Sequence, residues 1–342
     1  MSTEVYEERS RAAAATVELS YREAVCAALE DELEADGSTV LMGEDVATAG
    51  GVFKTNEGLA EKFGLERIRN TPICENGFVG VALGMAVTGM RPIVEIMFSD
   101  FLPTAGDAVV NELPKFRFMS GGQCVVPITI RSICGATNRF GAQHSATGES
   151  WYIGLPGLKV ATAASPASAY GVLRAAIRDD DPVLFFEHRA LYGRKGQVAR
   201  GEAGILPVGK AGIVRSGSDL TIVSTMLMTD RAAAACETLA SEGIDAEVIE
   251  LRWLRPLDYD TIVASVAKTG RLLVVEEQVH LAGWGSSVIS RLAMDAVPMH
   301  APPAAISMPD NLLIPYTPTL EDEVIPSVDL IASTVRRYLA KA

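Results

Sequence analysis

The sequence is poor in the side chains that bind transition metals or form disulfides. Its 342 residues include five cysteines and four histidines, and no CxxC or HExxH spacing occurs. The cysteines are odd in number and scattered, at Cys26, Cys74, Cys124, Cys134 and Cys236. A zinc site or a disulfide framework is therefore not expected.

Long apolar runs and an excess of basic charge are missing as well. No run of about 18 apolar residues exists, which argues against a membrane span. The acidic N-terminal sequence has no apolar core, so it fits neither a signal peptide nor a transit peptide, and we expect a cytoplasmic protein. Forty-three acidic residues against thirty basic ones give a net charge of −13. This balance disfavours nucleic acid as the main ligand and suits a basic protein partner.

Three common nucleotide-binding and hydrolase motifs are also absent. No GxGxxG follows a predicted strand, and neither GxxxxGK[ST] nor GxSxG occurs. The sequence therefore gives no support to a nicotinamide-binding Rossmann domain, a P-loop nucleotidase or an α/β-hydrolase.

What the chain contains is typical of a packed α/β protein. Hydrophobic residues make up 48% and charged residues 21%. Strand patterns at 39–42, 92–97, 125–131, 158–163 and 182–187 alternate with helical patterns at 20–35, 78–90, 104–118 and 166–178. A second series has strands at 220–224, 246–251 and 271–275 and helices at 230–242 and 258–268. This alternation predicts two open, mostly parallel sheets covered by helices.

A segment of different composition separates the two series of predicted elements. The run at 193–209 is Gly-rich, carries mixed charge and lacks periodicity. We expect a flexible lead-in at 1–16, a first domain at 17–195, a linker at 196–209 and a second domain at 210–342. The length fits two domains, since a single core rarely exceeds roughly 250–300 residues.

The segment 71–89, TPICENGFVGVALGMAVTG, is the most unusual one. From Phe78 onward it is apolar on every side, which predicts a buried helix, and its glycines would let another backbone or a partner helix approach. Glu75 stands just before this helix, where the helix N-terminus favours its charged form and an apolar setting its neutral form. Such a carboxyl can donate or accept protons, or it can simply cap the helix.

Other candidates come from loops and strand ends. His144, in RFGAQHSATGES, is either a catalytic side chain or a solvated one. His188, at a strand end, is expected to make a structural hydrogen bond. Phe101, after the strand at 92–97, is by default a core residue.

Six motifs follow one another along the chain: TPICENGFVGVALG, RPIVEIMFSDF, KFRFMSGGQ, GAQHSATGESW, LPGLKV and AAIRDDDPVLFFEH. In this order they resemble the beta subunit of the thiamine-diphosphate-dependent decarboxylase component of 2-oxo acid dehydrogenase complexes, a group that includes acetoin dehydrogenase beta subunits. The similarity extends from about Leu19 to the C-terminus, with GEDV at 43–46, RPLD at 255–258 and IPYTPTLEDEVIPS at 314–327. It implies a transketolase-like pyrimidine-binding domain followed by a transketolase C-terminal-like domain.

The resemblance also implies roles for individual residues. Glu75 would bond to N1′ of the aminopyrimidine of thiamine diphosphate, Ile73 would contact the cofactor and Phe101 would stack against the pyrimidine. His144 would handle protons near the substrate and the incoming lipoyl group.

A monovalent cation site, with potassium expected, would fall on Ile128, Ala176, Ile177, Asp179 and Asp181, mostly through main-chain carbonyls. The other possibility is that IRDDDP is merely an acidic turn after a helix.

Family members hold the diphosphate through Mg²⁺ with a GDG motif, and no GDG occurs in this chain. The resemblance therefore implies a partner alpha subunit that supplies the diphosphate and Mg²⁺ site, in a heterotetramer of two alpha and two beta chains. The helix at 78–90 is a plausible contact surface for this assembly.

The second domain is expected to carry no catalytic residue and to support docking of a dihydrolipoyl acyltransferase core. The acidic residues Glu321, Asp322 and Glu323 fit attraction to a basic docking domain or a solvated surface.

Two departures from the family pattern concern the site. Cys74 replaces a serine, and Asn138-Arg139-Phe140 replaces a smaller run, which could reshape the substrate pocket. We expect oxidative decarboxylation of a 2-oxo acid such as pyruvate, with acyl transfer to lipoamide. Acetoin cleavage is the close alternative, and a transketolase-like transfer or a non-catalytic assembly subunit are more distant ones.

Overall fold

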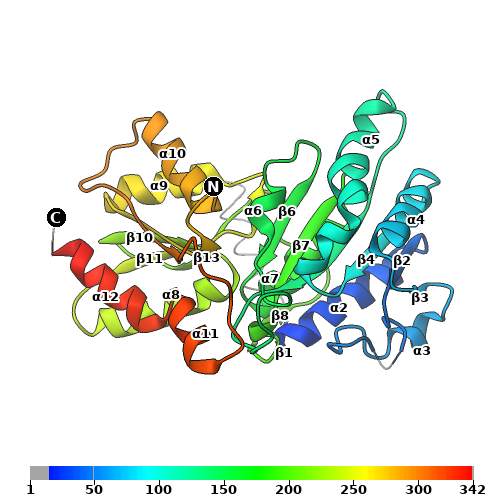
Figure 1. Cartoon of the computed structure of the whole chain (residues 1–342), viewed down its shortest axis with the longest axis horizontal. Coiled ribbons are helices and arrows are strands. Elements are labelled where there is room, and N and C mark those ends of the chain that lie inside the picture. Colours follow the sequence, from blue (N-terminus) through cyan, green and yellow to red (C-terminus); the bar gives the residue numbers. More distant parts are fainter. Residues whose placement is uncertain (1–14, 49, 341–342) are drawn as a thin grey trace.

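The first half of the chain is built on a seven-stranded sheet, with the order β12-β6-β7-β5-β4-β2-β3 (Figure 1). The computed structural model describes residues 15–48 and 50–340. Neighbouring strands are parallel except for β12, which runs antiparallel to β6. The strands are β2 (Thr39–Gly43), β3 (Ile68–Asn70), β4 (Arg91–Ile96), β5 (Thr129–Cys134), β6 (Lys159–Ala163), β7 (Val183–His188) and β12 (Trp253–Arg255).

The second half contains a five-stranded sheet of order β14-β13-β10-β11-β9, parallel except for β9. Its strands are β9 (Gly212–Arg215), β10 (Leu220–Ser224), β11 (Ala246–Glu250), β13 (Leu272–Val279) and β14 (Ala304–Met308). Helices flank both sheets (Figure 1), so the predicted fold class of two open, mostly parallel sheets covered by helices is confirmed.

Helices follow most strands. The first half has α2 (Tyr21–Ala35), α3 (Leu59–Phe63), α4 (Glu75–Val87), the 3₁₀ helix η1 (Ser99–Ala105), the π-helix η2 (Asp107–Glu112), α5 (Leu113–Met119), α6 (Glu149–Tyr152), α7 (Pro166–Ile177) and the 3₁₀ turns η3 (Arg189–Leu191) and η4 (Glu202–Gly204). The second half has α8 (Met226–Ala240), α9 (Tyr259–Thr269), α10 (Trp284–Met294), α11 (Pro318–Val324) and α12 (Val328–Leu339). Among these described helices, none has the length and apolar character needed to cross a membrane.

Among the predicted elements that differ from the structure, two lie at prolines. The strand predicted at 125–131 begins only at Thr129 and continues to Cys134, because Pro127 has no N–H for the ladder. The single helix predicted at 104–118 is three short helices, and α5 begins with Pro114 in its first turn. Proline cannot continue the hydrogen bonding of a preceding helix but is well placed to start a new one.

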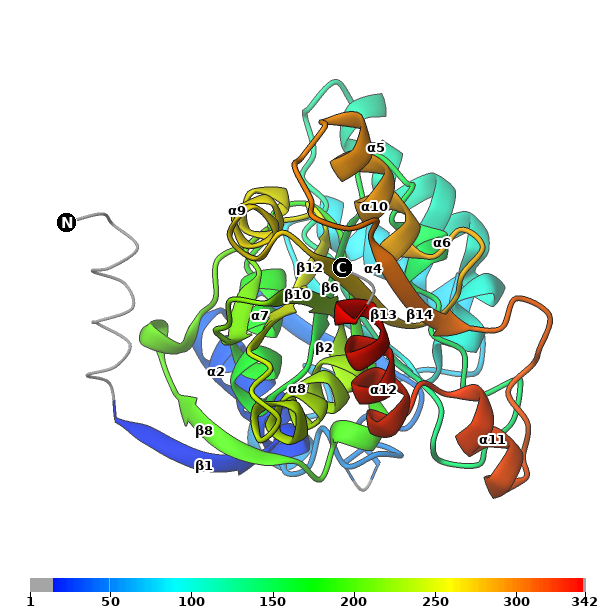
Figure 2. The ribbon, with the colours of Figure 1, turned by 90° about the vertical axis from the view of Figure 1, so that its left-hand side faces the viewer.

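The predicted linker contains an ordered strand. Residues 195–199 form β8 (Lys195–Ala199), which pairs antiparallel with β1 (Thr16–Ser20), as Figure 2 shows. Later in the chain, β12 returns to the first sheet by pairing with β6. The two halves are thus connected by strand pairing as well as by the linker. The lead-in predicted at 1–16 lies almost wholly outside the described residues.

Candidate active site

Glu75 is the first residue of α4 and is half-buried. No side-chain hydrogen bond caps this helix at Cys74. Glu44, which follows β2, lies near Glu75. Burial raises the pKa of the Glu44 carboxyl, and the charges of Glu75 and Asp45 raise it further. Oε1 of Glu44 is buried without a hydrogen-bond partner in the described part of the chain. The unpartnered oxygen of Glu44 therefore leaves a hydrogen-bonding group available near Glu75.

The helix α4 is not buried on every side within this chain, so that prediction is wrong. Its inner face consists of Phe78, Val79, Ala82 and Ala86. The opposite face is open, because Val81 is 57% exposed and the glycines at 77, 80 and 84 are exposed as well. The apolar pattern comes partly from small residues on a surface that the single chain leaves uncovered.

Ile73, just before α4, is 82% exposed. An isoleucine this exposed beside a half-buried carboxylate leaves an apolar surface available to a ligand or a partner. The role predicted for it, a cofactor contact, stays a prediction.

Phe101 and His144 are brought together by the fold. Phe101 lies on η1, directly after β4, and its ring centroid is 5.4 Å from that of His144, in an edge-to-face arrangement. Phe98 contacts both rings, at 5.6 Å from Phe101 and 4.9 Å from His144. Phe101 is half-buried and not a core residue. Burial raises the pKa of the neighbouring Asp100 carboxyl, although His144 opposes this.

The segment with Phe101 packs against the helix with Glu75. The main-chain N–H of Ala108 donates to Oδ1 of Asn76 at 3.3 Å, and η1 and η2 both contact α4. Three of the four residues predicted to be catalytic or cofactor-binding, Glu75, Phe101 and His144, therefore lie on neighbouring segments of the chain.

The His144 loop, residues 135–148, joins β5 to α6. Thr137 and Arg139 have φ angles of 77° and 62°, a left-handed conformation that costs on the order of 1–3 kcal/mol for residues other than glycine. Such strain persists only where surrounding contacts hold it. Two buried carboxylates of the second half provide these contacts.

Glu277, on β13, accepts the N–H of Ala136 at 2.7 Å and lies 3.0 Å from Nε2 of His188. Burial alone would raise the pKa of Glu277, but His188 and the Ala136 N–H hold it below its usual value. The predicted structural hydrogen bond of His188 is thereby confirmed.

Glu321, on α11, accepts the N–H of Thr137 at 2.9 Å and that of Arg139 at 3.4 Å. The Arg139 guanidinium also pairs with Glu321 and Asp322. One expectation is corrected here. Glu321 is fully buried, so it cannot meet a docking partner. The side chain of Arg139 pairs with α11, and an effect of residues 138–140 on the substrate pocket stays a prediction.

A cavity of about 290 Å³ lies beside the His144 loop. Both halves of the chain line it, with Asp100, Thr147 and Trp151 on one side and Gln278 and Leu313 on the other. Trp151 is 72% exposed, so the apolar lining continues to the surface. The cavity combines apolar walls with a few polar groups, as small-molecule sites do.

The residues predicted to bind a monovalent cation lie around the end of α7. Arg91 donates to the carbonyls of Ile177 and Asp179 at 2.9 and 2.7 Å, and the N–H of Val183 donates to the carbonyl of Ile128 at 2.9 Å. The carbonyl of Ala176 accepts the N–H of Asp179 at 3.2 Å. Each carbonyl oxygen has two lone pairs, so a single bond leaves capacity for a cation.

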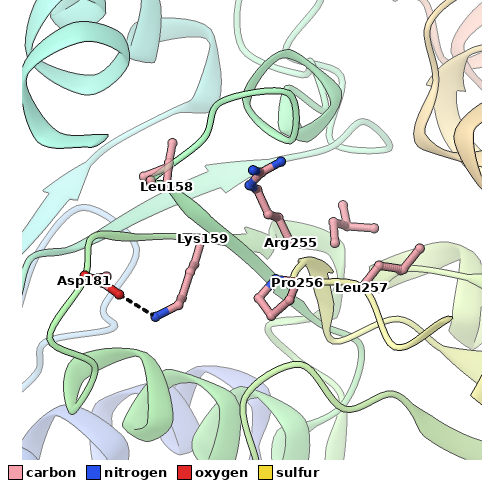
Figure 3. Close-up of a pocket in the computed structure, with 8 residues that line it drawn as sticks. Leu158, Lys159, Asp181, Arg255, Pro256 and Leu257 are labelled. Carbon is pink, nitrogen blue, oxygen red and sulfur yellow. Dashed lines mark hydrogen bonds and ion pairs between the residues drawn. The ribbon is translucent and has the colours of Figure 1, made fainter. Parts of the chain in front are cut away.

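The two carboxylates of this set already have a partner. Nζ of Lys159 is 2.6 Å from Oδ1 of Asp179 and 3.1 Å from Oδ2 of Asp181. Figure 3 shows Lys159 reaching toward Asp181 at the margin of a cavity of about 500 Å³, which Arg255, Pro256 and Leu257 also line. Within residues 15–48 and 50–340, no three or more His, Cys, Asp or Glu side chains form a group that could hold a metal ion.

Comparisons with known proteins agree with this architecture. The family described as "Transketolase, pyrimidine binding domain" matches residues 17–195, and "Transketolase, C-terminal domain" matches residues 209–331. The beta subunit of acetoin:2,6-dichlorophenolindophenol oxidoreductase from Cupriavidus necator is 42% identical over 333 residues, covering 94% of this chain and 97% of that protein. This chain belongs to the transketolase-like family of such beta subunits.

Other members of the family are pyruvate dehydrogenase subunits. The E1 component subunit beta from Rhizobium meliloti is 40% identical, covering 94% of this chain and 70% of that protein. The mitochondrial E1 component subunit beta-2 from Oryza sativa subsp. japonica is 42% identical, covering 96% and 88%. The solved structure of a split-gene transketolase, an inactive beta4 tetramer, shares the fold with a TM-score of 0.76 at 23% identity, over 94% of this chain and 98% of that one. The family resemblance predicted from the six motifs is confirmed.

Proposed function

We propose that this chain is the beta subunit of a thiamine-diphosphate-dependent 2-oxo acid dehydrogenase. The reaction is oxidative decarboxylation of a 2-oxo acid such as pyruvate, with transfer of the acyl group to lipoamide. The observation that carries the proposal is the position of Glu75, half-buried at the start of α4 beside Glu44, in a chain 40–42% identical over nearly its whole length to pyruvate and acetoin dehydrogenase beta subunits.

The residues around Glu75 fit an aminopyrimidine ring. Such a ring has nitrogen atoms on its edge and apolar faces. Glu75 and the unpartnered Oε1 of Glu44 offer hydrogen-bonding groups for the edge, and the exposed Ile73 and half-buried Phe101 offer apolar surface for the faces. When bound, thiamine diphosphate supplies the electron sink for loss of carbon dioxide.

The protein side chains then have separate tasks. Glu75 holds a proton shared with N1′ of the ring, a role for which its position between a helix N-terminus and a second carboxyl is suited. Phe101 packs on the pyrimidine, and His144, in contact with Phe101, moves protons at the substrate.

The partner expected from the sequence is part of this proposal. An alpha subunit supplies the diphosphate and Mg²⁺ site, so that the enzyme is active only as an assembly of two alpha and two beta chains. The exposed small-residue face of α4 supports such an assembly, since it is apolar and uncovered in the single chain. A dihydrolipoyl acyltransferase core receives the acyl group. The cytoplasmic location stays a prediction.

Acetoin cleavage is the second candidate, because the Cupriavidus necator relative named for acetoin is as similar as the pyruvate dehydrogenase subunits. A substrate panel on the enzyme co-expressed with its alpha subunit separates the two. Pyruvate, branched-chain 2-oxo acids and acetoin are compared by reduction of 2,6-dichlorophenolindophenol.

Glu75→Gln tests the central assignment. Glutamine keeps the shape but cannot hold the shared proton, so we expect turnover to fall by about 10²-fold or more, while assembly with the alpha subunit is retained. Dye-reduction kinetics and size-exclusion chromatography measure the two properties, with the exposed Glu66→Gln as the matched control. Near-normal turnover of Glu75→Gln would refute the role of Glu75.

The cation site is proposed to hold K⁺ through the carbonyls of Ile128, Ala176, Ile177 and Asp179, with the side chain of Asp181 nearby. We expect the assembled enzyme to lose thermal stability and activity when potassium chloride is replaced by choline chloride at equal ionic strength, because choline is too large for a carbonyl cage. Differential scanning fluorimetry and activity are both read. Identical melting curves in the two salts would argue for a simple acidic turn.

A further inference from the structure

Two carboxylates of the second half reach the loop that carries His144. The loop contacts of Glu277 and Glu321 span 141 and 184 residues of sequence, and both carboxylates are at most 4% exposed. Neither touches the residues predicted to bind the cofactor. Their main-chain partners are the N–H groups of Ala136, Thr137 and Arg139, at the start of the His144 loop.

The far end of the same loop is held from the same side. The Thr147 hydroxyl donates to the carbonyl of Glu277 at 2.8 Å, and the amide of Gln278 donates to the carbonyl of Thr147 at 2.7 Å. Between these ends, Gly141 packs under the ring of Tyr316, so closely that a Cβ on Gly141 would collide with it. The second half therefore contacts the loop at its start, middle and end, with His144 between Gly141 and Thr147.

These contacts explain a conformation that the loop would not adopt alone. Thr137 is β-branched and has a φ of 77°, which is unfavourable for this residue type. Its N–H and that of Arg139 both point to Glu321. A buried carboxylate is a strong acceptor for two N–H groups, and removing it leaves both part-buried donors without this acceptor.

We propose that Glu277 and Glu321 are positioning residues, which hold the His144 loop in the shape that sets the imidazole against Phe98 and Phe101. The second domain thereby helps to shape the active site of the first. For its effect on turnover this proposal rests on the proposed function, whereas the effect on loop structure is independent of it.

The experiment compares Glu277→Ala and Glu321→Ala, each in the enzyme co-expressed with its alpha subunit. Hydrogen exchange of residues 135–148 should rise by about tenfold or more in both variants, because amides that lose their acceptor exchange through easier local opening. Turnover should fall by about 10–10²-fold with a smaller change in KM, since a displaced catalytic group impairs the reacting geometry more than binding. Glu277→Gln and Glu321→Gln keep one acceptor oxygen and should restore most of both properties.

Matched controls separate positioning from general stability. Glu276→Ala removes a buried carboxylate on the same strand, which binds the N–H of Gly285 and the hydroxyl of Ser307 and not the loop. Glu323→Gln changes an exposed neighbour of Glu321. Neither should alter exchange in residues 135–148.

The outcomes decide the proposal as follows. Faster loop exchange together with lower turnover in the alanine variants, and not in the controls, supports it. Unchanged exchange in the alanine variants, or the same loss in Glu276→Ala, overturns it. If an alanine variant fails to fold, Tyr316→Ala replaces it, since Tyr316 is 65% exposed and its loss should speed exchange around Gly141 alone. Unchanged exchange around Gly141 in Tyr316→Ala also counts against the proposal. A wild-type enzyme without thiamine-dependent activity would refute the proposed function, but the exchange test of the loop would still be valid.

Discussion

Buried carboxyl groups organise the region around His144. Glu277 and Glu321 accept main-chain N–H groups, whereas Glu149, at the start of α6, has an oxygen that is buried without a hydrogen-bond partner among the described residues. Burial raises the pKa of Glu149 to about 7. The pKa values of Glu149 and Glu277 are thus shifted in opposite directions, because burial dominates at Glu149 whereas His188 and the Ala136 N–H stabilise the charged form of Glu277.

Glu149 should make the stability of the chain depend on pH. Its pKa is about 7 in the folded chain against an ordinary 4.5, so the stabilisation is full below pH 4.5 and is lost as the pH rises to 7. At about 1.4 kcal/mol per pKa unit the difference is roughly 3 kcal/mol. Glu149→Gln cannot ionise, so its free energy of unfolding should fall less than that of the wild type between about pH 5 and about pH 8. Urea unfolding of the purified chain measures this, and parallel pH profiles would contradict it.

At the scale of elements, local signals were sufficient where one segment determines its own structure. The helix predicted at 20–35 is observed at Tyr21–Ala35, and its start is set by a capping box between Ser20 and Glu23. The hydrophobic pattern predicted one helix where prolines divide the segment 99–119 into three short helices. The pattern also gave no prediction for β9, β14 and the helices α10, α11 and α12. Short or strongly amphipathic elements of this kind are fixed by what they pack against.

The candidate site divides in the same way. The motifs point to Glu75, Phe101 and His144 through a family resemblance, and the structure brings Phe101 and His144 into ring contact. Glu277 and Glu321 were not predicted as parts of the site. Their partners are main-chain N–H groups more than a hundred residues away. Because almost every residue has such a group, the sequence contains no motif that identifies the partner. The one available signal was Glu276-Glu277-Gln278, three polar residues in a row at the end of an apolar strand.

The open face of α4 leads to a prediction about assembly. A Cβ at Gly84 would meet no atom within 4 Å in this chain, so Gly84→Leu should fold normally and strengthen the helix. If α4 contacts a partner through its small residues, leucine there blocks the approach. We expect the variant to remain a folded beta chain but to lose co-purification with the alpha subunit, as measured by light scattering after size exclusion.

Gly37→Leu is the matched control for this experiment. Gly37 is exposed, has no atom within 4 Å of an added Cβ, and lies in the turn between α2 and β2. It should leave assembly intact. Full assembly of Gly84→Leu would exclude close helix contact at this position.

At the scale of the whole molecule, the two halves are not independent units. The strand β12 belongs to the second half by sequence but pairs with β6 at the edge of the first sheet. Trp253, on β12, is only 1% exposed, so this edge is part of the hydrophobic core. The first half therefore depends on the second for an edge strand of its sheet, which is β12, and for the contacts of Glu277 and Glu321 with the His144 loop.

A fragment of residues 15–209 should therefore be prone to aggregation. Without β12 it exposes the edge of β6, and unpaired edges promote association between chains. We expect the fragment to aggregate in size exclusion, and co-expression with residues 210–342 to restore a soluble pair. A monodisperse, folded fragment on its own would show that β12 is dispensable.

The glycine-bearing face of α4 has a consequence for subunit balance in the cell. Glycine inside a helix costs roughly 0.5–1 kcal/mol relative to alanine, and α4 contains three glycines within 13 residues. A copy made in excess of its partner keeps this weak, apolar helix uncovered, next to the chemistry that it serves. Chaperones and proteases act on such surfaces, so we expect copies without a partner to be degraded faster than assembled ones.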